Sequence, residues 1–359
     1  MTKTGMKGLI LAGGKGTRLR PLTYTSAKQL IPVANKPILF YGLESMAAAG
    51  IREIGIVVGD THLDIRKACG DGSQWGVSIT YIQQDQPLGL AHAVKISQEF
   101  LGEDKFCMYL GDNLLKDGIT NLIQEYEKSR ANAMILLTQV PNPQQFGVAE
   151  VDMMGNITRL IEKPAAPKSN LALVGVYLFD KRIFQACEAI RPSERGELEI
   201  TDAIQFLIVS GYIVKPSMVT GWWKDTGKRD DLLEANRLVL QNIMRDVKGE
   251  IRGRKPIEGN VIIPQEALII DSRIRGPVII GKDAKIENSY IGPFTSIGPG
   301  VHISGSEIEH SIVMQGAEIL NLNTRLVDCV LGRNSLMTMT DERPKAVRAM
   351  LGDNSQVYL

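Results

Sequence analysis

Three glycines and three cations lie within eleven residues near the N-terminus, in segment 11–21 with the sequence LAGGKGTRLRP. Because Gly13, Gly14 and Gly16 have no Cβ atom, the backbone there can bend sharply and bring its N–H groups against a ligand. Arg18 adds a planar guanidinium whose donors suit phosphate oxygens. A short apolar run precedes the segment and is typical of a buried parallel strand. We therefore interpret the segment as a phosphate-binding loop and expect its ligand to be a nucleotide.

Two familiar phosphate-binding motifs do not match this loop. A P-loop places Ser or Thr after its Gly-Lys pair, whereas Gly16 follows Lys15 here. The dinucleotide fingerprint has a third glycine three residues after its second, and Leu19 stands at that place. The remaining alternative is a turn that only joins a strand to a helix, and the basic residues beside the glycines argue against it.

Two carboxylates follow strand-like runs and are candidate ligands of one Mg²⁺ ion. Asp112 comes directly after an apolar run, at the carboxyl end of a strand, where open α/β sheets bind ligands. Asp225 stands between a strand-like run and a helical segment. Each also has a simpler interpretation, Asp112 as a turn residue and Asp225 as the N-cap of a helix. Lys28 is a second cation able to reach the same phosphates, or else a solvated surface lysine.

A second group of charged residues lies in the middle of the chain and suggests a sugar-phosphate site. Glu162 is a candidate acceptor for sugar hydroxyl groups, and Lys163 is a candidate partner for a phosphate. Arg195 stands beside a glycine just before a helical segment with acidic residues. The alternatives are a solvated Glu-Lys pair and acidic residues that only favour the helix N-terminus.

The elements that position these residues have the pattern of an α/β domain over residues 1–245. Apolar strands alternate with amphipathic helical segments, which predicts a Rossmann-like, mostly parallel mixed sheet with helices on both faces. Segment 148–162 predicts a β-hairpin that turns at Gly155 and Asn156. The expected strands are 8–12, 53–58, 78–83, 106–110, 134–139 and 173–179, and the expected helices are 38–49, 90–100, 119–129, 200–210 and 229–243.

A different pattern begins at residue 259. Aliphatic residues recur every six positions from Leu268 to Ile286 and, after a one-residue slip, from Ile291 to Ile303. This spacing predicts a left-handed parallel β-helix with three short strands in each coil, because a string of ordinary hairpins would not keep it. Segment 246–258 is rich in Lys, Arg and Gly and is expected to be a linker, so the second domain is predicted to span 259–359 with a C-terminal tail.

Composition excludes several kinds of partner. The chain of 359 residues has a net charge of +1 at pH 7, so an electrostatic grip on nucleic acid or on a membrane is not expected. No apolar run approaches the length of about 18 residues that a membrane span needs, and the first residues lack a signal-peptide pattern. The four cysteines have no metal-ligand spacing, and Cys107 and Cys187 are interpreted as reduced packing residues. We expect a cytoplasmic protein.

Taken together and in order, the motifs closely resemble those of the glucose-1-phosphate thymidylyltransferases, a family of sugar nucleotidyltransferases. The resemblance covers residues 6 to about 240, and the attached repeat domain is similar to the long form of that family. The motifs that carry the resemblance are 11–21, 28–30, 70–73, 110–113, 162–164, 195–202 and 223–227.

The resemblance implies a role for each matching residue. The implied nucleotide-binding residues are Leu11, Ala12, Gly13, Gly14, Gly16, Thr17, Arg18, Gln84, Gly89 and Asp112. The implied sugar-phosphate-binding residues are Gly147, Glu162, Lys163, Gly175 and Arg195. The implied catalytic residues are Arg18, Lys28 and Lys163, and the implied ligands of the cofactor Mg²⁺ are Asp112 and Asp225.

The implied reaction is transfer of a thymidylyl group from dTTP to glucose 1-phosphate, by attack of the sugar phosphate on the α-phosphorus with loss of pyrophosphate. Gln84 matches the glutamine of the family that reads the pyrimidine edge, and the family also implies a homo-oligomer. Phe146 and Leu88 depart from the short forms, which usually have tyrosine and aspartate there. Three alternatives stay open: a uridylyl- or guanylyltransferase, an added acyltransferase using His302 or His310, and a non-catalytic nucleotide-sugar sensor.

Overall fold

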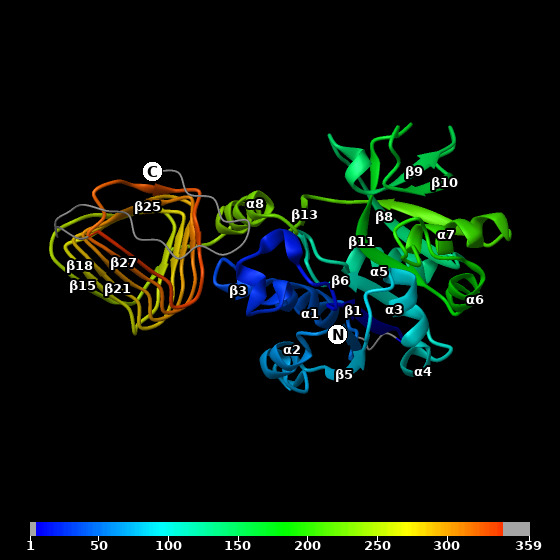
Figure 1. Ribbon diagram of the computed structural model, residues 1–359, viewed down its shortest axis with the longest axis horizontal. Helices are drawn as coiled ribbons and strands as arrows, with labels where there is room; N and C mark the ends of the chain where they lie inside the picture. The colour runs from blue at the N-terminus through cyan, green and yellow to red at the C-terminus, as the bar shows by residue number, and fades with distance from the viewer. Residues whose placement is uncertain (1–4, 340–359) are drawn as a thin grey trace. The chain divides into compact units, whose positions relative to one another are not determined.

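The computed structural model describes residues 5–339, and the chain divides into two compact units (Figure 1). The first unit comprises residues 5–15, 26–30 and 38–225. The second comprises residues 16–25, 31–37 and 226–339, so it includes two short segments from the N-terminal part of the chain. Within the described residues, no helix has the length and apolar character needed to cross a membrane.

Nine strands form the sheet of the first unit: β1 (Lys7–Leu11), β4 (Glu53–Val58), β5 (Ser78–Gln83), β6 (Phe106–Leu110), β8 (Ala133–Gln139), β9 (Gly147–Val151), β10 (Ile157–Glu162), β11 (Leu171–Phe179) and β12 (Val214–Met218). Their order is β10-β9-β11-β6-β1-β4-β5, and β8 pairs with both β11 and β12. Strands β6, β1, β4 and β5 are parallel, whereas β11 runs antiparallel to β6 and to β8. The predicted mixed, mostly parallel sheet is therefore confirmed.

Seven helices accompany this sheet: α1 (Ile38–Ala48), α2 (His62–Cys69), α3 (Leu90–Ile96), α4 (Gln98–Leu101), α5 (Thr120–Lys128), α6 (Arg182–Ala189) and α7 (Ile200–Val209). Two buried clusters form the core, one with side chains of α1, α2 and α5 and the other with side chains of α3, α4, α6 and α7. Strand β1 contributes to both, because successive side chains point to opposite faces: Ile10 packs in the first cluster, and Leu9 and Leu11 pack in the second. Figure 1 accordingly shows α2 and α4 on opposite sides of β1.

Most expected elements of this unit lie where the sequence predicts them, with three differences. Helices α2 and α6 and strand β12 were not predicted. The helix expected over 90–100 is divided into α3 and α4 at Ser97, whose buried hydroxyl donates to the carbonyl of Ala93 at 2.7 Å. Two short strands, β7 (Asn113–Leu115) and β13 (Trp223–Asp225), form a separate antiparallel pair that carries candidate site residues.

The second unit consists of a parallel β-helix, helix α8 (Arg229–Leu240) and a short hairpin of β2 (Pro32–Val33) and β3 (Lys36–Pro37). Its first sheet contains β14 (Asp246–Val247), β17 (Val261–Ile263), β20 (Val278–Ile280), β23 (Thr295–Ile297), β26 (Ile312–Val313) and β29 (Val330–Leu331). The second contains β15 (Glu250–Arg252), β18 (Leu268–Ile270), β21 (Lys285–Glu287), β24 (His302–Ser304), β27 (Glu318–Leu320) and β30 (Leu336–Thr338). The third contains β16 (Ile257–Glu258), β19 (Arg273–Arg275), β22 (Tyr290–Ile291), β25 (Glu307–Glu309) and β28 (Leu326–Val327).

The described coils confirm the predicted left-handed β-helix and correct its register. Val261 pairs with Val278, and Leu268 pairs with Lys285, so one coil takes 17 residues rather than three full hexapeptides. The one-residue slip in the aliphatic spacing follows from such a 17-residue coil. Later coils differ in length, because Ser296 pairs with Ile312 after 16 residues and Ile312 pairs with Val330 after 18. The corrected register also explains one wrong assignment, because Ile269 is the fully buried residue of β18 and the expected Leu268 is only half-buried.

The segment 246–258, expected to be a linker, has strands in the structure. Strands β14, β15 and β16 pair in parallel with β17, β18 and β19, so this segment forms a first coil of the β-helix. Its strands carry few aliphatic residues and much charge, which explains why composition suggested a linker. Segment 340–359, the predicted tail, lies outside the described residues.

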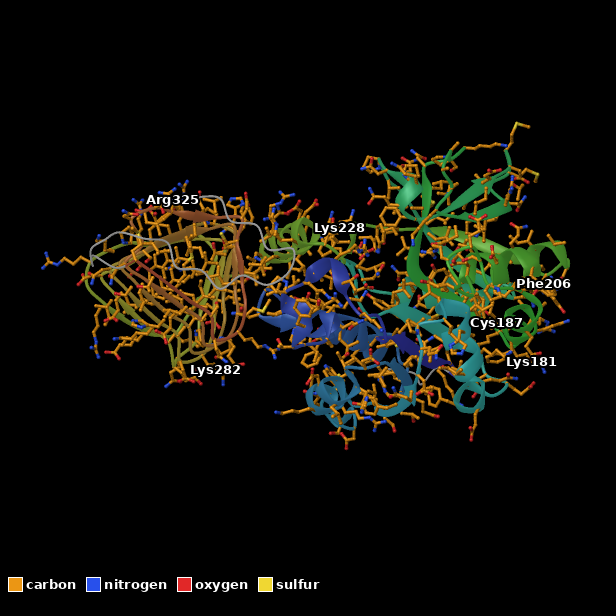
Figure 2. All side chains as sticks on the ribbon, in the orientation of Figure 1. Lys181, Cys187, Phe206, Lys228, Lys282 and Arg325 are labelled. Atoms are coloured by element: carbon orange, nitrogen blue, oxygen red, sulfur yellow. The ribbon has the colours of Figure 1, made fainter. Side chains whose placement is uncertain are left out.

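The two histidines considered for acyl transfer lie on the β-helix in unlike surroundings. His302 Nε2 is 3.0 Å from a carboxylate oxygen of Glu287, and the ring of His310 packs edge-on against Phe294 with 5.1 Å between ring centroids. Both contacts are ordinary side-chain contacts on the coils. Figure 2 shows Lys282 and Arg325 on the outside of the same coils.

Candidate active site

The glycine-rich loop begins where β1 ends, and its glycines allow two functional side chains to approach. The N–H of Ala12 donates to the carbonyl of Val57 at 2.8 Å, so the chain stays bonded to β4 up to the first glycine of the loop. A Cβ on Gly13 would lie 3.1 Å from Gln84 Oε1, and a Cβ on Gly14 would lie 3.1 Å from Lys28 Cε. Side chains at these two positions would therefore displace the glutamine or the lysine.

Lys28 and Asp112 form a close ion pair beside this loop. Lys28 lies in a single 3₁₀ turn (Lys28–Leu30), and Asp112 follows the end of β6. Both side chains are mostly buried, with 16% and 14% of their areas exposed. Burial alone would raise the pKa of Asp112, but the charge of Lys28 and its hydrogen bond lower that pKa below the ordinary value. The carboxylate is therefore held in its charged form.

Asn113 connects the two halves of the candidate site, and sequence reasoning missed its role. Its Oδ1 accepts hydrogen bonds from the N–H of Gly175 at 3.2 Å and from the indole N–H of Trp223 at 2.6 Å. Its Nδ2 donates to Asp112 Oδ1 at 3.1 Å. The side chain is almost fully buried, so these bonds fix the relative positions of β7, β11 and β13.

Of the candidate metal ligands, Asp112 lies in the turn between β6 and β7, and Asp225 is the last residue of β13. Asp225 pairs with Asn113 in the antiparallel β13–β7 ladder. Asn113 directly follows Asp112 in the chain, so the backbones of the two aspartates are close together. Mg²⁺ is commonly bound through one or two carboxylates together with phosphates and water, and two carboxylates at adjoining strand ends fit that pattern. No cluster of three or more His, Cys, Asp or Glu side chains suited to a metal occurs among residues 5–339.

Gln84, which is expected to recognise the base, has two polar contacts that orient its side chain amide. Its Nε2 donates to the carbonyl of Gly89 at 3.3 Å and lies 3.0 Å from His92 Nδ1. Burial, with a smaller contribution from Lys95, lowers the pKa of His92, so the neutral ring is able to accept this hydrogen bond. Gly89 has a φ of 104°, and a Cβ there would stand 2.4 Å from the carbonyl oxygen of Leu198. His92 is a further residue that sequence reasoning missed.

The expected sugar-phosphate residues are brought together around Glu162. Glu162 lies 3.4 Å from Lys163 Nζ and 3.5 Å from Arg195 Nη2, and Thr201 Oγ1 donates to its other carboxylate oxygen at 3.4 Å. Burial raises the pKa of Glu162, and the nearby charge of Glu199 adds to this, although both cations act in the opposite direction. The cluster contains one more carboxylate than the sequence analysis considered.

That further carboxylate, Glu199, orients the arginine. Both of its oxygens lie 2.8 Å from Arg195 Nη2, and its side chain is almost fully buried at the start of α7. The acidic residues here were weighed only as favourable neighbours of a helix N-terminus. The structure instead shows Glu199 holding the guanidinium in place beside Glu162.

At the two glycines expected on the sugar side, a Cβ atom would be too close to neighbouring side chains. Gly147 pairs with Glu162 across β9 and β10, and a Cβ on it would stand 2.7 Å from Thr201 Cγ2. A Cβ on Gly175 would stand 2.7 Å from Asn113 Oδ1. Phe146, which replaces a tyrosine of the short forms, packs edge-on against Trp223 with 5.5 Å between ring centroids.

The rest of the glycine-rich loop, from Gly16 onward, belongs to the second unit. Gly16 has a φ of 63°, and its carbonyl accepts a hydrogen bond from Thr23 Oγ1 at 2.7 Å. Thr17 and Arg18 lie in a single 3₁₀ turn (Thr17–Leu19) and are exposed.

The sheet topology and this set of side chains are those of a nucleotidyltransferase. The family described as nucleotidyl transferase matches residues 7–242. A glucose-1-phosphate thymidylyltransferase of Streptomyces griseus is 51% identical over 354 residues, covering 99% of both chains. A low-salt glycan biosynthesis nucleotidyltransferase of Haloferax volcanii is 48% identical over 358 residues, covering 99% of this chain and 100% of the relative.

A solved structure shows the same catalytic fold. It is a crystal structure from Bacillus anthracis of a candidate glucose-1-phosphate thymidylyltransferase in complex with sucrose, with a TM-score of 0.63 and 37% identity. It covers 67% of this chain and 97% of its own length, consistent with a relative of the short form. The chain belongs to the glucose-1-phosphate thymidylyltransferase family of nucleotidyltransferases, and its C-terminal β-helix is consistent with the long form.

Proposed function

We propose that this enzyme transfers a thymidylyl group from dTTP to glucose 1-phosphate, producing dTDP-glucose and pyrophosphate. The observation that carries the proposal is the Lys28–Asp112 pair, which lies beside the glycine-rich loop and is joined through Asn113 to Gly175 on the sugar side. A full-length relative bearing the name of this activity supports the choice of substrates.

The chemical step is one in-line displacement at the α-phosphorus. A phosphate oxygen of the sugar phosphate forms a bond to that phosphorus, the bond to the β-phosphate oxygen breaks, and pyrophosphate leaves with the electron pair. The attacking phosphate is already anionic at neutral pH, so the reaction needs no general base. The protein must instead hold two polyanions together in the right orientation.

The cations divide this task. Arg18 and Lys28 face the triphosphate, while Lys163 and Arg195 hold the phosphate of the sugar. Glu199 keeps Arg195 oriented, so that its remaining donors are available to the ligand.

Mg²⁺ would be held by Asp112 and Asp225 and, when bound, would neutralise charge on the phosphates. Lys28 maintains the charged form of Asp112 that such binding requires. Asn113 fixes the orientation of the same carboxylate through its Nδ2 bond.

Specificity for the base is assigned to Gln84, and specificity for the sugar is assigned to Glu162. Gln84, fixed by Gly89 and His92, would hydrogen-bond the pyrimidine edge. Glu162 would accept hydrogen bonds from sugar hydroxyls, and Gly147 and Gly175 leave room for the ring.

A matrix of substrates tests the proposal. The enzyme is mixed with dTTP, UTP, GTP or ATP against several sugar 1-phosphates, and pyrophosphate release is measured. The highest kcat/KM is expected for dTTP with glucose 1-phosphate. A marked preference for UTP or GTP would overturn the thymidylyl assignment, and a preference for another sugar would overturn the glucose assignment.

We also propose a homo-oligomer, for which light scattering should give a mass above that of one chain.

A further inference from the structure

The side-chain amide of Gln84 is held in one of its two orientations. Its Nε2 donates to the carbonyl of Gly89 at 3.3 Å and lies 3.0 Å from Nδ1 of His92. Because a carbonyl oxygen only accepts hydrogen bonds, Gly89 disfavours the flipped amide, in which Oε1 would face that carbonyl. Nδ1 of His92 then accepts as well, which places the proton of the neutral ring on the other nitrogen of the histidine.

Both acceptors belong to the start of α3, but they are not equivalent. Gly89 is the N-cap of α3, and its carbonyl also accepts the N–H of Ala93 at 3.2 Å, the first bond of the helix. The glutamine therefore shares the Gly89 carbonyl with the backbone of the helix. Within residues 5–339, the hydrogen bond of His92 Nδ1 goes to Gln84 alone, and it is the shorter of the two contacts. His92 is thus the side chain in this part of the structure that is dedicated to the amide.

The oxygen of the same amide faces the glycine-rich loop. A Cβ built on Gly13 would lie 3.1 Å from Gln84 Oε1. Both hydrogen bonds of the amide among the described residues use Nε2, so Oε1 keeps its lone pairs for a ligand. The backbone of Gln84 is fixed as well, because its N–H donates to the carbonyl of Val58 at 2.8 Å. The first unit therefore presents an oriented hydrogen-bond acceptor beside the loop.

An oriented acceptor distinguishes between pyrimidine bases. Thymine and uracil carry an N3–H donor between two carbonyl groups, whereas N3 of cytosine is an acceptor beside an amino group. Oε1 of the held amide accepts from the N3–H of a pyrimidine-2,4-dione but would face the N3 lone pair of cytosine. A glutamine free to flip would offer Nε2 to cytosine instead, so discrimination requires the amide to be held.

We propose that His92 is a positioning residue that makes the nucleotide site select pyrimidine-2,4-diones over cytosine, by holding the amide oxygen of Gln84 toward the base. The inference rests on the proposed function, since it takes Gln84 to meet the base. His92 acts through the glutamine and not through a contact of its own with the nucleotide. Burial, with a smaller contribution from Lys95, lowers the pKa of His92, so the accepting form of the ring is present at neutral pH.

Two substitutions of His92 test this inference in the full-length enzyme. His92→Leu removes the acceptor and keeps a side chain that suits a helix, whereas His92→Asn is the matched control, because its Oδ1 is able to take the place of Nδ1 and accept from Gln84. Calorimetry measures Kd for dTTP and dCTP, and steady-state assays measure kcat/KM for both nucleotides and KM for glucose 1-phosphate. We expect the preference for dTTP over dCTP to fall about tenfold in His92→Leu and to stay close to that of the wild type in His92→Asn. KM for glucose 1-phosphate should be unchanged in both variants.

Several results would overturn the inference. They are a wild type that binds dCTP as tightly as dTTP, an unchanged preference in folded His92→Leu, and an equal loss of preference in His92→Asn. A loss of affinity for both nucleotides by the same factor would also overturn it, because a merely structural role of His92 predicts that result. If His92→Leu does not fold, His92→Ala removes the same acceptor and decides.

The same measurements separate this inference from the proposed function. A wild type that binds dTTP but forms no product with glucose 1-phosphate would refute the proposed function, and the ratio of the two Kd values would still decide the role of His92. A preference for UTP over dTTP would refute the thymidylyl assignment alone, because uracil presents the same N3–H.

Discussion

Replacing Asn113 by alanine should damage both stability and catalysis, because this buried side chain has three hydrogen-bond partners. The substitution leaves the N–H of Gly175 and the indole N–H of Trp223 without their acceptor. An unpaired buried donor costs about 1–3 kcal/mol, so loss of the acceptor of the buried Gly175 N–H should lower the free energy of unfolding by about 1–3 kcal/mol. The half-buried indole N–H of Trp223 adds a smaller loss. Urea unfolding followed by tryptophan fluorescence measures this change.

The effect on catalysis comes from the third partner. Asp112 loses the hydrogen bond from Asn113 Nδ2, and a bond to a charged group contributes about 1.5–3 kcal/mol. If this energy is needed to orient the carboxylate in the transition state, kcat should fall about ten- to a hundredfold, at about 1.36 kcal/mol for each factor of ten. The assay is steady-state release of pyrophosphate at saturating substrates, over a titration of Mg²⁺.

A second asparagine serves as the matched control. Asn132 accepts a hydrogen bond from the N–H of Ile213 at 2.9 Å and donates to Asp180 at 2.9 Å, and no residue assigned to the site is among these partners. Asn132→Ala should therefore lower stability and leave kcat unchanged. A destabilised Asn113→Ala enzyme with the kcat and Mg²⁺ dependence of the wild type would refute the positioning role.

Three further predictions concern the charged residues and the tight glycine. Lys163→Ala and Asp112→Asn should each lower kcat by more than tenfold while thermal unfolding stays cooperative, and near-normal turnover of either variant would refute its assigned role. Gly175→Ala should lower kcat/KM for glucose 1-phosphate, because its Cβ would stand 2.7 Å from the amide of Asn113, and unchanged kinetics would show that the backbone shifts freely. The raised pKa of Glu162 means that charging it opposes folding, so the wild type should gain stability relative to Glu162→Gln as pH falls through that pKa. Urea unfolding from neutral to acidic pH measures this difference, and a constant or opposite difference would contradict the assigned shift.

Much of the fold could be predicted because its signals are local. Apolar runs bounded by glycine or polar residues marked the parallel strands, and the aliphatic spacing marked the β-helix. The register was less accessible, since a coil of 17 residues leaves neighbouring positions such as Leu268 and Ile269 equally apolar in sequence, and only the pairing shows which one is buried. Segment 246–258 was mistaken for a linker because its strands are stabilised mainly by backbone pairing with the next coil.

In the candidate site too, the residues in local motifs could be predicted, whereas residues whose roles depend on tertiary contacts could not. Gly13, Gly14 and Asp112 were predicted from motifs, and the structure supplies a reason for each glycine in the side chain that approaches it. Asn113 and Glu199 were missed because their roles depend on partners distant in sequence or on burial that a motif does not show. An asparagine next to a candidate carboxylate and a glutamate four residues after an arginine are the weak signals that were present.

The most direct test of the central claim follows the α-phosphorus itself. dTTP labelled with ³²P at the α position is incubated with glucose 1-phosphate, Mg²⁺ and the enzyme, and the products are separated. The account predicts that all transferred label appears in a sugar nucleotide, with one unlabelled pyrophosphate released for each molecule formed. Label bound covalently to the protein, label released as dTMP, or nucleotide binding without any product would contradict it.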